Sequence, residues 1–325
     1  MTMEFNLSEV QVSFKTRGES LGKELPEDAA AADVVMGAAR VGLIDPRADL
    51  LAMALAVEGL AYESSAAAIA FGLHAGVVLG LATDDRFTAL VRGETVGAIA
   101  LSTDELPEEQ SGLLKGRASL VGPLTDHGLA IVGARGPDGV MAYAVSLDLP
   151  GVKVDDMRTA ALSGFVCGRV SFEGAACIAL GPTLPFMTAV RVLLAAAGLG
   201  MGRRALREAL HAAHGHRGRG AGGEQTVQGL LADAATELDA AMVLVWKSAS
   251  APARSLADAS MAKLAATEAT QRAVARATQV VGVDSFRRGH IVERLSQDVR
   301  ALELFAGRTE ALREAVADEV LPKWE

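Results

Sequence analysis

The residues best suited to chemistry gather in one short segment of the chain that holds three histidines and two arginines. His211 and His214 are spaced so that both could lie on one helix face and bind a metal ion, with His216 close by. Glycines interrupt this segment, which favours a solvated loop, and we predict no metal site. Arg217 and Arg219 could clamp a phosphate or simply keep a loop tip soluble, and both interpretations stay open.

A run of glycines from Gly198 to Gly202 is the second candidate, because it looks at first like a dinucleotide-binding fingerprint. That fingerprint requires a strand before it, whereas both flanks here have a helical pattern. We therefore expect these glycines to let another helix approach closely. The sequence contains no Gly-x-x-x-x-Gly-Lys-Ser/Thr loop, so it gives no support for a nucleoside triphosphatase.

The composition limits the class of protein. Half of the 325 residues are apolar but only 4% are aromatic, so the core must be built from Ala, Val and Leu, which favours packed helices. A formal charge of -9 gives no global attraction for nucleic acid or an acidic membrane. Cys167 and Cys177 have no second pair, and residues 1–23 lack an apolar signal segment. We expect a cytoplasmic protein, with 65–82 as a buried helix.

The hydrophobic pattern changes twice along the chain, from helical to strand-like near Gly93 and back to helical after Pro182. We predict a mainly α protein with a central small β domain. The domains are a helical N-terminal domain at 1–93, a β domain at 94–183 and a C-terminal helical bundle at 184–325. Short apolar runs between turn signals predict strands at 96–101, 128–132, 140–147 and 166–172.

The C-terminal region is predicted to form a bundle of about four long helices. Five helical ranges are expected in it: 186–211, 224–250, a third helix that starts at Ser255 and ends at Gly282, and the shorter ranges 292–305 and 309–320. Ser255 and Asp258 form a capping-box-like start. The expected buried stripe of the third helix is Met261, Leu264, Ala265, Val274 and Val281.

Three stretches of this bundle follow one another in a recognisable order. Ala259-Ser-Met-Ala-Lys-Leu-Ala-Ala-Thr-Glu-Ala is followed by Thr278-Gln-Val-Val-Gly-Val and then by Ile291-Val-Glu-Arg-Leu-Ser-Gln-Asp-Val-Arg-Ala. Together they resemble the acyl-CoA dehydrogenase family of flavoproteins, in which a helix ends in Gln-Val-x-Gly-Gly and a Val-Glu-Arg-x-x-Arg-Asp-Ala-Arg helix follows. Residues 224–239 and 93–101 are similar to two further family segments.

The resemblance implies a helical N-terminal domain, a β domain and a C-terminal four-helix bundle, usually in a tetramer. Such proteins bind FAD and remove a proton and a hydride from the α and β carbons of an acyl-CoA thioester. About ninety residues precede the β domain here, fewer than is usual in the family. We therefore expect a degenerate, N-terminally shortened member with incomplete substrate enclosure, like the smaller subunit of heteromeric acyl-CoA dehydrogenases.

The resemblance also places the catalytic base. In most members it is the Glu of a Tyr-Glu-Gly-Thr turn, and here the turn reads Phe305-Ala306-Gly307-Arg308. The alternative position, on the first bundle helix, falls near Val190 and Arg191, again without a carboxylate. Alanine cannot accept a proton, so the chain is expected to lack a general base worth about 10²–10⁴-fold in rate. Arg191 is a candidate substrate-binding residue.

The implied flavin contacts divide into lost and retained groups. The family's Gly-rich loop is replaced here by the acidic segment 102–109, and its aromatic and hydroxyl residues fall at Leu120 and Gly122. The groups that touch the FAD of a neighbouring subunit align with Arg219, Gln279 and Gly282.

This division leads to three functional hypotheses. The first is a base-lacking subunit in an α2β2-like complex with a catalytic acyl-CoA dehydrogenase subunit, acting with an electron-transfer flavoprotein on a fatty, steroid or aromatic acyl-CoA. The second is a self-sufficient homo-oligomeric flavoenzyme with an altered base or chemistry. The third is a non-catalytic structural subunit. No nucleic acid or membrane is expected as a partner.

Overall fold

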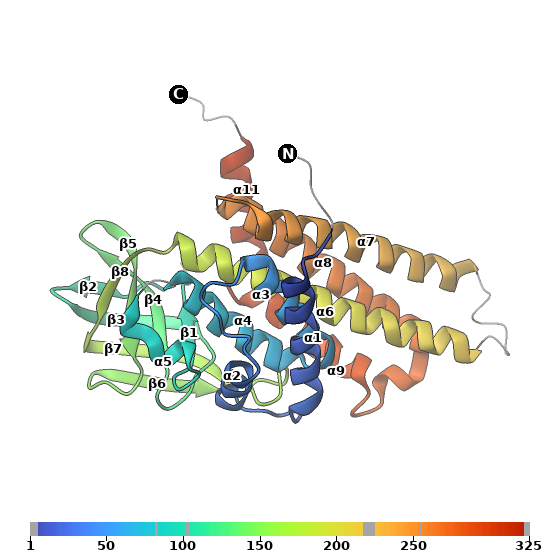
Figure 1. The fold of residues 1–325 in the computed structure, drawn as a ribbon, viewed down its shortest axis with the longest axis horizontal. Coiled ribbons are helices and arrows are strands. Elements are labelled where there is room, and N and C mark those ends of the chain that lie inside the picture. Colours follow the sequence, from blue (N-terminus) through green and yellow to red (C-terminus); the bar gives the residue numbers. More distant parts are fainter. Residues whose placement is uncertain (1–5, 82–83, 102–104, 217–224, 254, 322–325) are drawn as a thin grey trace.

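The computed structural model describes residues 6–81, 84–101, 105–216, 225–253 and 255–321. A β-sheet lies at one end of the molecule and long helices extend from it toward the other end (Figure 1). The N-terminal helices are α1 (Glu9–Glu24), α2 (Ala31–Arg40), α3 (Leu50–Glu63), α4 (Ser65–Gly80), the short 3₁₀ helix η1 (Asp85–Phe87) and α5 (Thr88–Val91). The helical pattern that the sequence shows before Gly93 thus corresponds to helices in the described residues.

Polar side chains cap the starts of α1, α3 and α4. Ser8 and Gln11 form a reciprocal capping box at the start of α1, and Asp49 accepts a hydrogen bond from the backbone N–H of Ala52 at 2.6 Å. Ser64 ends α3 and caps α4, so the two helices meet with a single residue between them. The α4 helix is buried on all sides, as expected for 65–82, since its side chains carry almost no polar groups.

The part of the sheet that the structure describes has eight strands. They are β1 (Gly97–Ala100), β2 (Glu108–Gln110), β3 (Leu113–Val121), β4 (Leu129–Gly136), β5 (Gly139–Ser146), β6 (Val152–Met157), β7 (Cys167–Ala176) and β8 (Ile178–Pro182). The main order is β6-β7-β3-β2-β4-β5-β8, and β1 pairs in parallel with β4. The sequence predicted β1, β4, β5 and β7 but not the other four strands.

The C-terminal region contains three long helices, α6 (Leu184–His216), α7 (Gln225–Ser250) and α8 (Leu256–Val281). The 3₁₀ helix η4 (Gly282–Phe286) and the shorter helices α9 (Ile291–Asp298), α10 (Ala301–Leu304) and α11 (Thr309–Val320) follow. The prediction of one helix over 292–305 was wrong, because the chain turns after Asp298 and starts α10 at Ala301. The first helix also runs past the predicted end at His211 to His216, so His214 is helical, and residues 217–224 lie outside the described residues.

The predicted buried stripe of α8 was partly wrong. Val274 and Val281 are buried, whereas Met261, Leu264 and Ala265 are only half-buried. The buried face is made mainly of alanines, because their small side chains let α8 pack closely along α6. Its members are Ala259, Ala262, Ala266, Ala269, Ala273 and Ala277.

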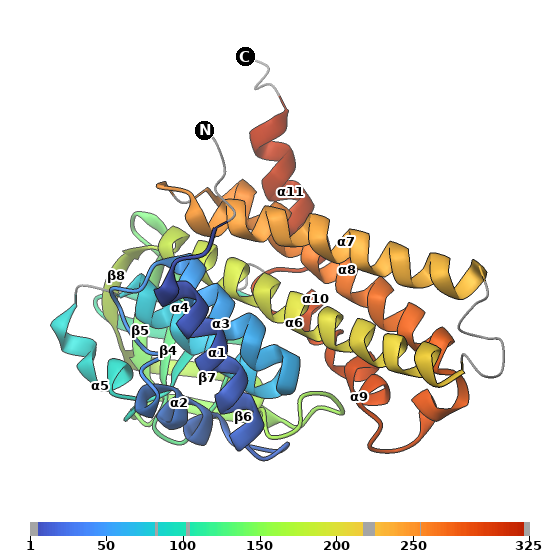
Figure 2. The same cartoon turned by 45° about the vertical axis from the view of Figure 1, so that its right-hand side comes forward.

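Two hydrophobic cores organise the molecule. One joins the N-terminal helices to the bundle, from Phe14 to Phe305, and α3 and α4 pack directly on α6 (Figure 2). The other lies within the sheet and includes Leu114, Val132 and Phe172. The helices on both sides of the β region therefore form one packed body rather than two separate ones.

One helix among those described, α6, is long and apolar enough to cross a membrane, and 83% of its most apolar stretch is buried inside the protein. Burial of this kind is typical of the central helix of a packed core.

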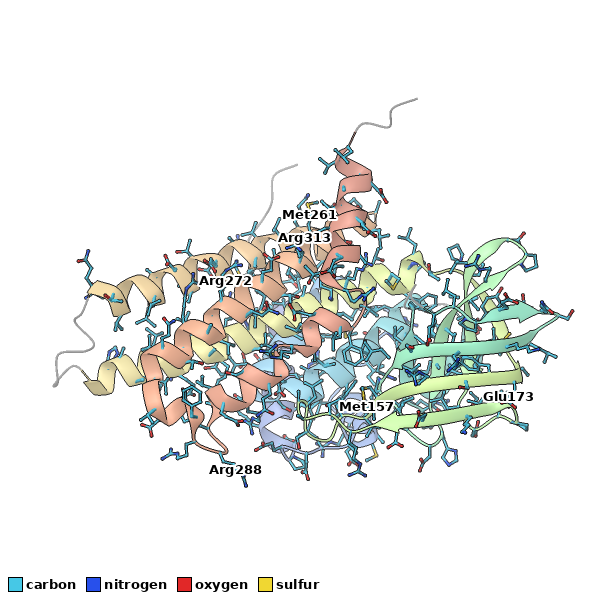
Figure 3. All side chains as sticks on the ribbon, turned by 180° about the vertical axis from the view of Figure 1, so that it is seen from behind. Met157, Glu173, Met261, Arg272, Arg288 and Arg313 are labelled. Atoms are coloured by element: carbon cyan, nitrogen blue, oxygen red, sulfur yellow. The ribbon has the colours of Figure 1, made fainter. Side chains whose placement is uncertain are left out.

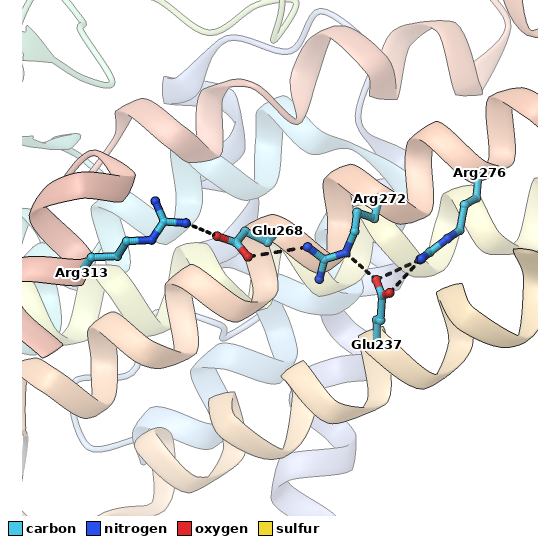
Figure 4. A network of polar contacts seen from close by, with 5 residues as sticks. All are labelled: Glu237, Glu268, Arg272, Arg276 and Arg313. Carbon is cyan, nitrogen blue, oxygen red and sulfur yellow. Dashed lines mark hydrogen bonds and ion pairs between the residues drawn. The ribbon is translucent and has the colours of Figure 1, made fainter. Parts of the chain in front are cut away.

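The last helix, α11, is tied to this bundle by charges (Figure 4). Arg313 on α11 contacts Glu268 on α8 at 2.8 Å, and Arg272 and Arg276 on α8 bind Glu237 on α7.

Candidate active site

A tight turn joins α10 to α11 at the position where the sequence predicts a missing base. Ala306 has a φ of 59° and Gly307 a φ of 110°, so both residues lie in the left-handed region. Phe305, just before them, is buried. The side chain of residue 306 is a methyl group, which cannot accept a proton.

Two buried cations hold this turn. Arg191 on α6 is 5% exposed, and its Nε donates to the carbonyl of Ala306 at 3.0 Å. Lys263 on α8 is 0% exposed, and its Nζ donates to the carbonyls of Leu302 and Gly307 at 2.8 and 3.1 Å. The turn therefore keeps its shape through side chains from two other helices.

The second anchor of Arg191 is a hydroxyl, because its Nη1 donates to Ser260 Oγ at 2.7 Å. Within the ranges that the structure describes, neither Arg191 nor Lys263 has a carboxylate within ion-pair distance. Burial lowers the pKa of Arg191 to about 10. Burial and the charge of Arg191 lower the pKa of Lys263 to about 7, and Glu303 opposes this shift only in part.

Two cavities flank the turn, between the sheet and the bundle. The cavity on the α6 side has a volume of about 380 Å³ and is lined by Arg191 and Ala306. The other has a volume of about 610 Å³ and extends along α9 and α10 to Phe286, past Met157 at the junction of sheet and bundle (Figure 3). Leu120, Leu304 and Phe305 line both cavities, so these side chains separate them.

Aromatic rings enclose Gly122, the position that the resemblance aligns with the family's hydroxyl residue. A Cβ added to Gly122 would lie 2.9 Å from the ring of Phe165 and 3.3 Å from that of Phe305. These two rings pack edge to face with centroids 5.4 Å apart. They occupy the space that a side chain at position 122 would need, so no hydroxyl donor can be accommodated there without rearrangement.

The acidic segment after β1 reaches the same region. Glu105 accepts a short hydrogen bond from Ser119, next to Leu120, which places a carboxylate close to the edge of the smaller cavity. The remainder of the acidic segment at 102–104 lies outside the described residues. Close approach of a negatively charged pyrophosphate to this carboxylate is unfavourable.

The groups predicted to serve a neighbouring flavin lie on the surface at the far end of α8. Gln279 is exposed, and Gly282 ends the helix with a φ of 73°. The next apolar side chains, Val283 and Phe286, are 85% and 77% exposed. Arg219 lies outside the described residues. Gln279 and Gly282 therefore lie at the same end of α8, close to exposed apolar side chains.

These residues now have a family context. Residues 183–321 match the family model of the acyl-CoA dehydrogenase C-terminal domain. The chain belongs to the acyl-CoA dehydrogenase family. Human mitochondrial short-chain specific acyl-CoA dehydrogenase is 26% identical to it over 314 residues, which cover 84% of this chain and 76% of the human protein.

Other relatives within the acyl-CoA dehydrogenase family match a shorter part. Cyclohexane-1-carbonyl-CoA dehydrogenase of Geobacter metallireducens is 32% identical over 100 residues, which cover 30% of this chain and 26% of that protein. The 3-sulfinopropanoyl-CoA desulfinase of Paraburkholderia xenovorans is 34% identical over 99 residues, with the same coverage. The match thus spans about a quarter of the length of these two relatives.

The solved structures support the acyl-CoA dehydrogenase fold. Butyryl-CoA dehydrogenase from Megasphaera elsdenii superposes with a TM-score of 0.85 at 18% identity, over 98% of this chain and 100% of that one. A glutaryl-coenzyme A dehydrogenase–glutaryl-CoA complex gives 0.86 at 18% identity, over 98% and 97%. The predicted fold class is therefore confirmed.

The other chemical candidates from the sequence are the histidines and the glycine run, and both lie on α6. His211 and His214 are exposed on α6, and no cluster of His, Cys, Asp and Glu in the described part of the chain could hold a metal ion. The glycines of α6 face neighbouring helices: a Cβ at Gly200 would lie 2.3 Å from the carbonyl oxygen of Glu58. The expectation of close helix approach is confirmed.

Sequence reasoning missed one motif and one pair of side chains. Gly18-Glu-Ser-Leu-Gly22 matches Gly-x-Ser-x-Gly, but it lies inside α1 rather than on a strand-to-helix turn, so Ser20 is no nucleophile. The missed pair is Arg191 with Lys263, whose joint hold on the turn depends on helix packing. A lysine in an otherwise small and apolar stretch, Ala262 to Ala266, is the signal that could have identified it.

Proposed function

We propose that this chain is the base-lacking subunit of a FAD-dependent acyl-CoA dehydrogenase. In this proposal it forms an α2β2-like hetero-oligomer with a catalytic subunit of the same family. The catalytic subunit dehydrogenates a CoA thioester, and an electron-transfer flavoprotein accepts the electrons. We place the complex in the cytoplasm.

One observation carries the proposal. The turn at 305–308 is held in place by two buried cations, yet Ala306 offers no proton acceptor at its centre. Removal of the α proton of a thioester needs a base within hydrogen-bond reach. A chain that keeps the turn without the base is suited to a partner that supplies the base.

The described residues fit FAD only on the side of a neighbouring chain. Within the chain's own crevice, Glu105, Leu120 and the Phe165–Phe305 pair oppose a flavin. At the end of α8, Gln279 offers an exposed amide, and nothing lies within 4 Å of a Cβ added to Gly282. The exposed Val283 and Phe286 beside them are apolar surface that an adjoining chain would cover.

FAD, when bound, supplies hydride acceptance from the β carbon. The residues of this chain that would hold it are Gln279, which donates from its amide, Gly282, which leaves space for the backbone approach, and Arg219, whose guanidinium suits a pyrophosphate. Arg191 would contact substrate only through its remaining Nη2 group, since Nε and Nη1 are used on the turn and on Ser260.

The substrate class is supported by the names of relatives. The name cyclohexane-1-carbonyl-CoA dehydrogenase gives a ring-containing CoA ester as the substrate of that protein, and the name short-chain specific acyl-CoA dehydrogenase gives a short-chain acyl-CoA. We propose a CoA ester of fatty, steroid or aromatic origin for the complex.

Co-expression tests the proposal. The chain would be produced alone and together with a catalytic acyl-CoA dehydrogenase encoded beside it, and flavin absorbance and subunit ratio would be measured. We expect a yellow complex with fewer FAD molecules than chains, and no acyl-CoA oxidation by this chain alone. A homo-oligomer with one FAD per chain that oxidises butyryl-CoA would overturn the proposal, and so would a complex without flavin.

A variant makes the test specific. Gln279→Leu removes one amide donor and is expected to weaken FAD retention by the complex about fivefold, which corresponds to one hydrogen bond. Gln271→Leu, two helical turns earlier on α8, is the matched control and should leave retention unchanged. Equal FAD retention by both variants would remove Gln279 from the flavin site.

A further inference from the structure

We propose that the 380 Å³ cavity beside Ala306 is a carboxylate-binding site, in which Arg191 and Lys263 on one side of the turn attract an anion with a short apolar chain. The proposal concerns this chain's own cavity and goes beyond the proposed function, because it needs neither FAD nor turnover. The anion would be a free carboxylic acid or the terminal carboxylate of an acyl group.

The first argument is charge. Buried cations are normally paired with carboxylates, since an unpaired charge away from water is costly. Arg191 and Lys263 are at least 95% buried, and in the described part of the chain their partners are carbonyl and hydroxyl groups only. These dipoles satisfy hydrogen bonds but supply no net negative charge. Among the described residues, Arg191 is therefore a buried positive charge without a carboxylate partner, and Lys263 adds to this charge when it is protonated.

The second argument is the position of the guanidinium. Nε and Nη1 of Arg191 are used on Ala306 and Ser260, while Nη2 lies 3.1 Å from the position of a Cβ built on Gly307. Arg191, Ala306 and Gly307 all line the cavity. A planar guanidinium with a remaining N–H₂ group suits a carboxylate oxygen better than it suits a neutral carbonyl.

The third argument is the balance of the other charges around the cavity. Glu314 and Asp318 on α11 line the outer wall, Glu105 lies at its edge beside Ser119, and Glu303 lies near Lys263. Glu105, Glu314 and Asp318 are exposed, so water and salt screen their fields. The two cations are buried and much less screened, which leaves the inner end of the cavity positive.

The walls define the remainder of the ligand. Ile99, Leu101, Met187, Leu256 and Leu304 give the cavity an apolar surface, and its volume lies at the lower end of the range for small-molecule sites. A methyl group at residue 306 leaves room where a glutamate would place its own carboxylate. An alkyl carboxylate of about six carbons matches both the surface and the charge.

Calorimetric titration of the full chain with hexanoate and with hexanamide tests the proposal, since the two differ in charge but hardly in shape. We expect hexanoate to bind at least tenfold more tightly. Ala306→Glu places a carboxylate in the cavity and should abolish this preference, whereas the matched Ala306→Gln should keep it. Equal binding of the two probes, no binding of either, or an unchanged preference in Ala306→Glu overturns the proposal.

Two further measurements separate a bound anion from a merely structural effect. An anion beside the turn favours the charged form of Lys263, so hexanoate binding near pH 7 should take up protons, seen as a heat that depends on the buffer. Glutaryl-CoA and butyryl-CoA then distinguish the sources. If the chain binds glutaryl-CoA more tightly than butyryl-CoA and Ala306→Glu abolishes this preference, the ligand is the terminal carboxylate of an acyl group. If the chain shows no such preference but still binds hexanoate, the ligand is a free carboxylic acid.

Discussion

Lys263 is a basic side chain without water around it, and its charge opposes folding. The pKa of Lys263 is about 7 in the folded chain, against an ordinary value of 10.5. Between these pH values the unfolded chain binds more protons than the native one, so stability increases as pH rises. Below pH 7 the full cost of the buried charge is present.

A methionine at this position removes that dependence. We expect the free energy of unfolding of the wild-type protein to rise from pH 7 to pH 9 by on the order of 2 kcal/mol more than that of Lys263→Met. Urea denaturation at both pH values measures the difference. Equal changes in the free energy of unfolding of the two proteins between pH 7 and pH 9 would show that burial does not lower the pKa of Lys263.

His74 is expected to lower the stability of the folded protein at acidic pH. It is fully buried on α4, and its Nδ1 accepts the backbone N–H of Gly97 at 2.9 Å, which links the helices to β1. Nε2 has no well-directed hydrogen bond, although the Leu90 backbone lies close enough to oppose the shift slightly. Burial lowers the pKa of His74 to about 4, from 6.5.

As pH falls below 6.5, His74 becomes protonated in the unfolded chain, whereas in the native chain it stays neutral until about pH 4. Stability should therefore decrease over this range by at most about 3 kcal/mol. His74→Asn keeps an acceptor at the position of Nδ1 and has no such titration. Thermal unfolding of both proteins at pH 7 and pH 4.5 should show a smaller loss for the variant, and an equal loss would refute this role.

Single residues also show the limits of sequence reasoning. The sequence itself contains Ala306, and the resemblance aligns this position with the family's base. The cations around it could not, because Arg191 and Lys263 lie on helices far from residue 306 in sequence. The ring of Phe165 that fills the space at Gly122 was equally invisible, since only the folded sheet brings it there.

At the scale of the elements, glycines set the distances between helices. Gly200 on α6 faces the backbone of α3, and an added Cβ would lie 2.3 Å from the carbonyl oxygen of Glu58. We expect Gly200→Ala to force α3 and α6 apart and to reduce the free energy of unfolding by about 2–4 kcal/mol. Chemical denaturation measures the change.

The control is a glycine in the same kind of element with free space. Nothing lies within 4 Å of a Cβ added to Gly229 on α7. There Gly229→Ala should leave stability unchanged or increase it by up to about 1 kcal/mol, through helix propensity alone. A stabilising Gly200→Ala would mean that α3 and α6 are not in this close contact.

The elements that the sequence did not reveal share a physical reason. The α1 helix has few apolar residues and is exposed along much of its length, so its helical period is weak. The strands β2, β6 and β8 are short or largely exposed, and they lack the apolar alternation that predicted β4 and β5. By contrast, the limits of α11 at 309–320 were predicted correctly, because α11 lies between a turn and the end of the apolar pattern.

On the scale of the whole molecule, the exposed apolar end of α8 is the surface that we expect a partner chain to cover. Phe286 is 77% exposed and lies beside Gln279 and Gly282. In the proposed complex, Phe286→Ser should reduce co-purification of the catalytic partner about tenfold, as loss of one buried aromatic anchor implies. Met36→Ser, at an exposed apolar position on α2, is the control. Undiminished co-purification of Phe286→Ser would place the interface elsewhere.

The shared helical core has a consequence for synthesis on the ribosome. About 100 residues separate the end of α4 at Gly80 from the start of α6 at Leu184, the helix that covers it. At ordinary translation rates, the apolar surface of α4 stays exposed for roughly 5–20 s before α6 is synthesised. Nascent chains stalled before Leu184 should therefore recruit chaperones strongly, and slower growth at low temperature should raise the yield of soluble protein.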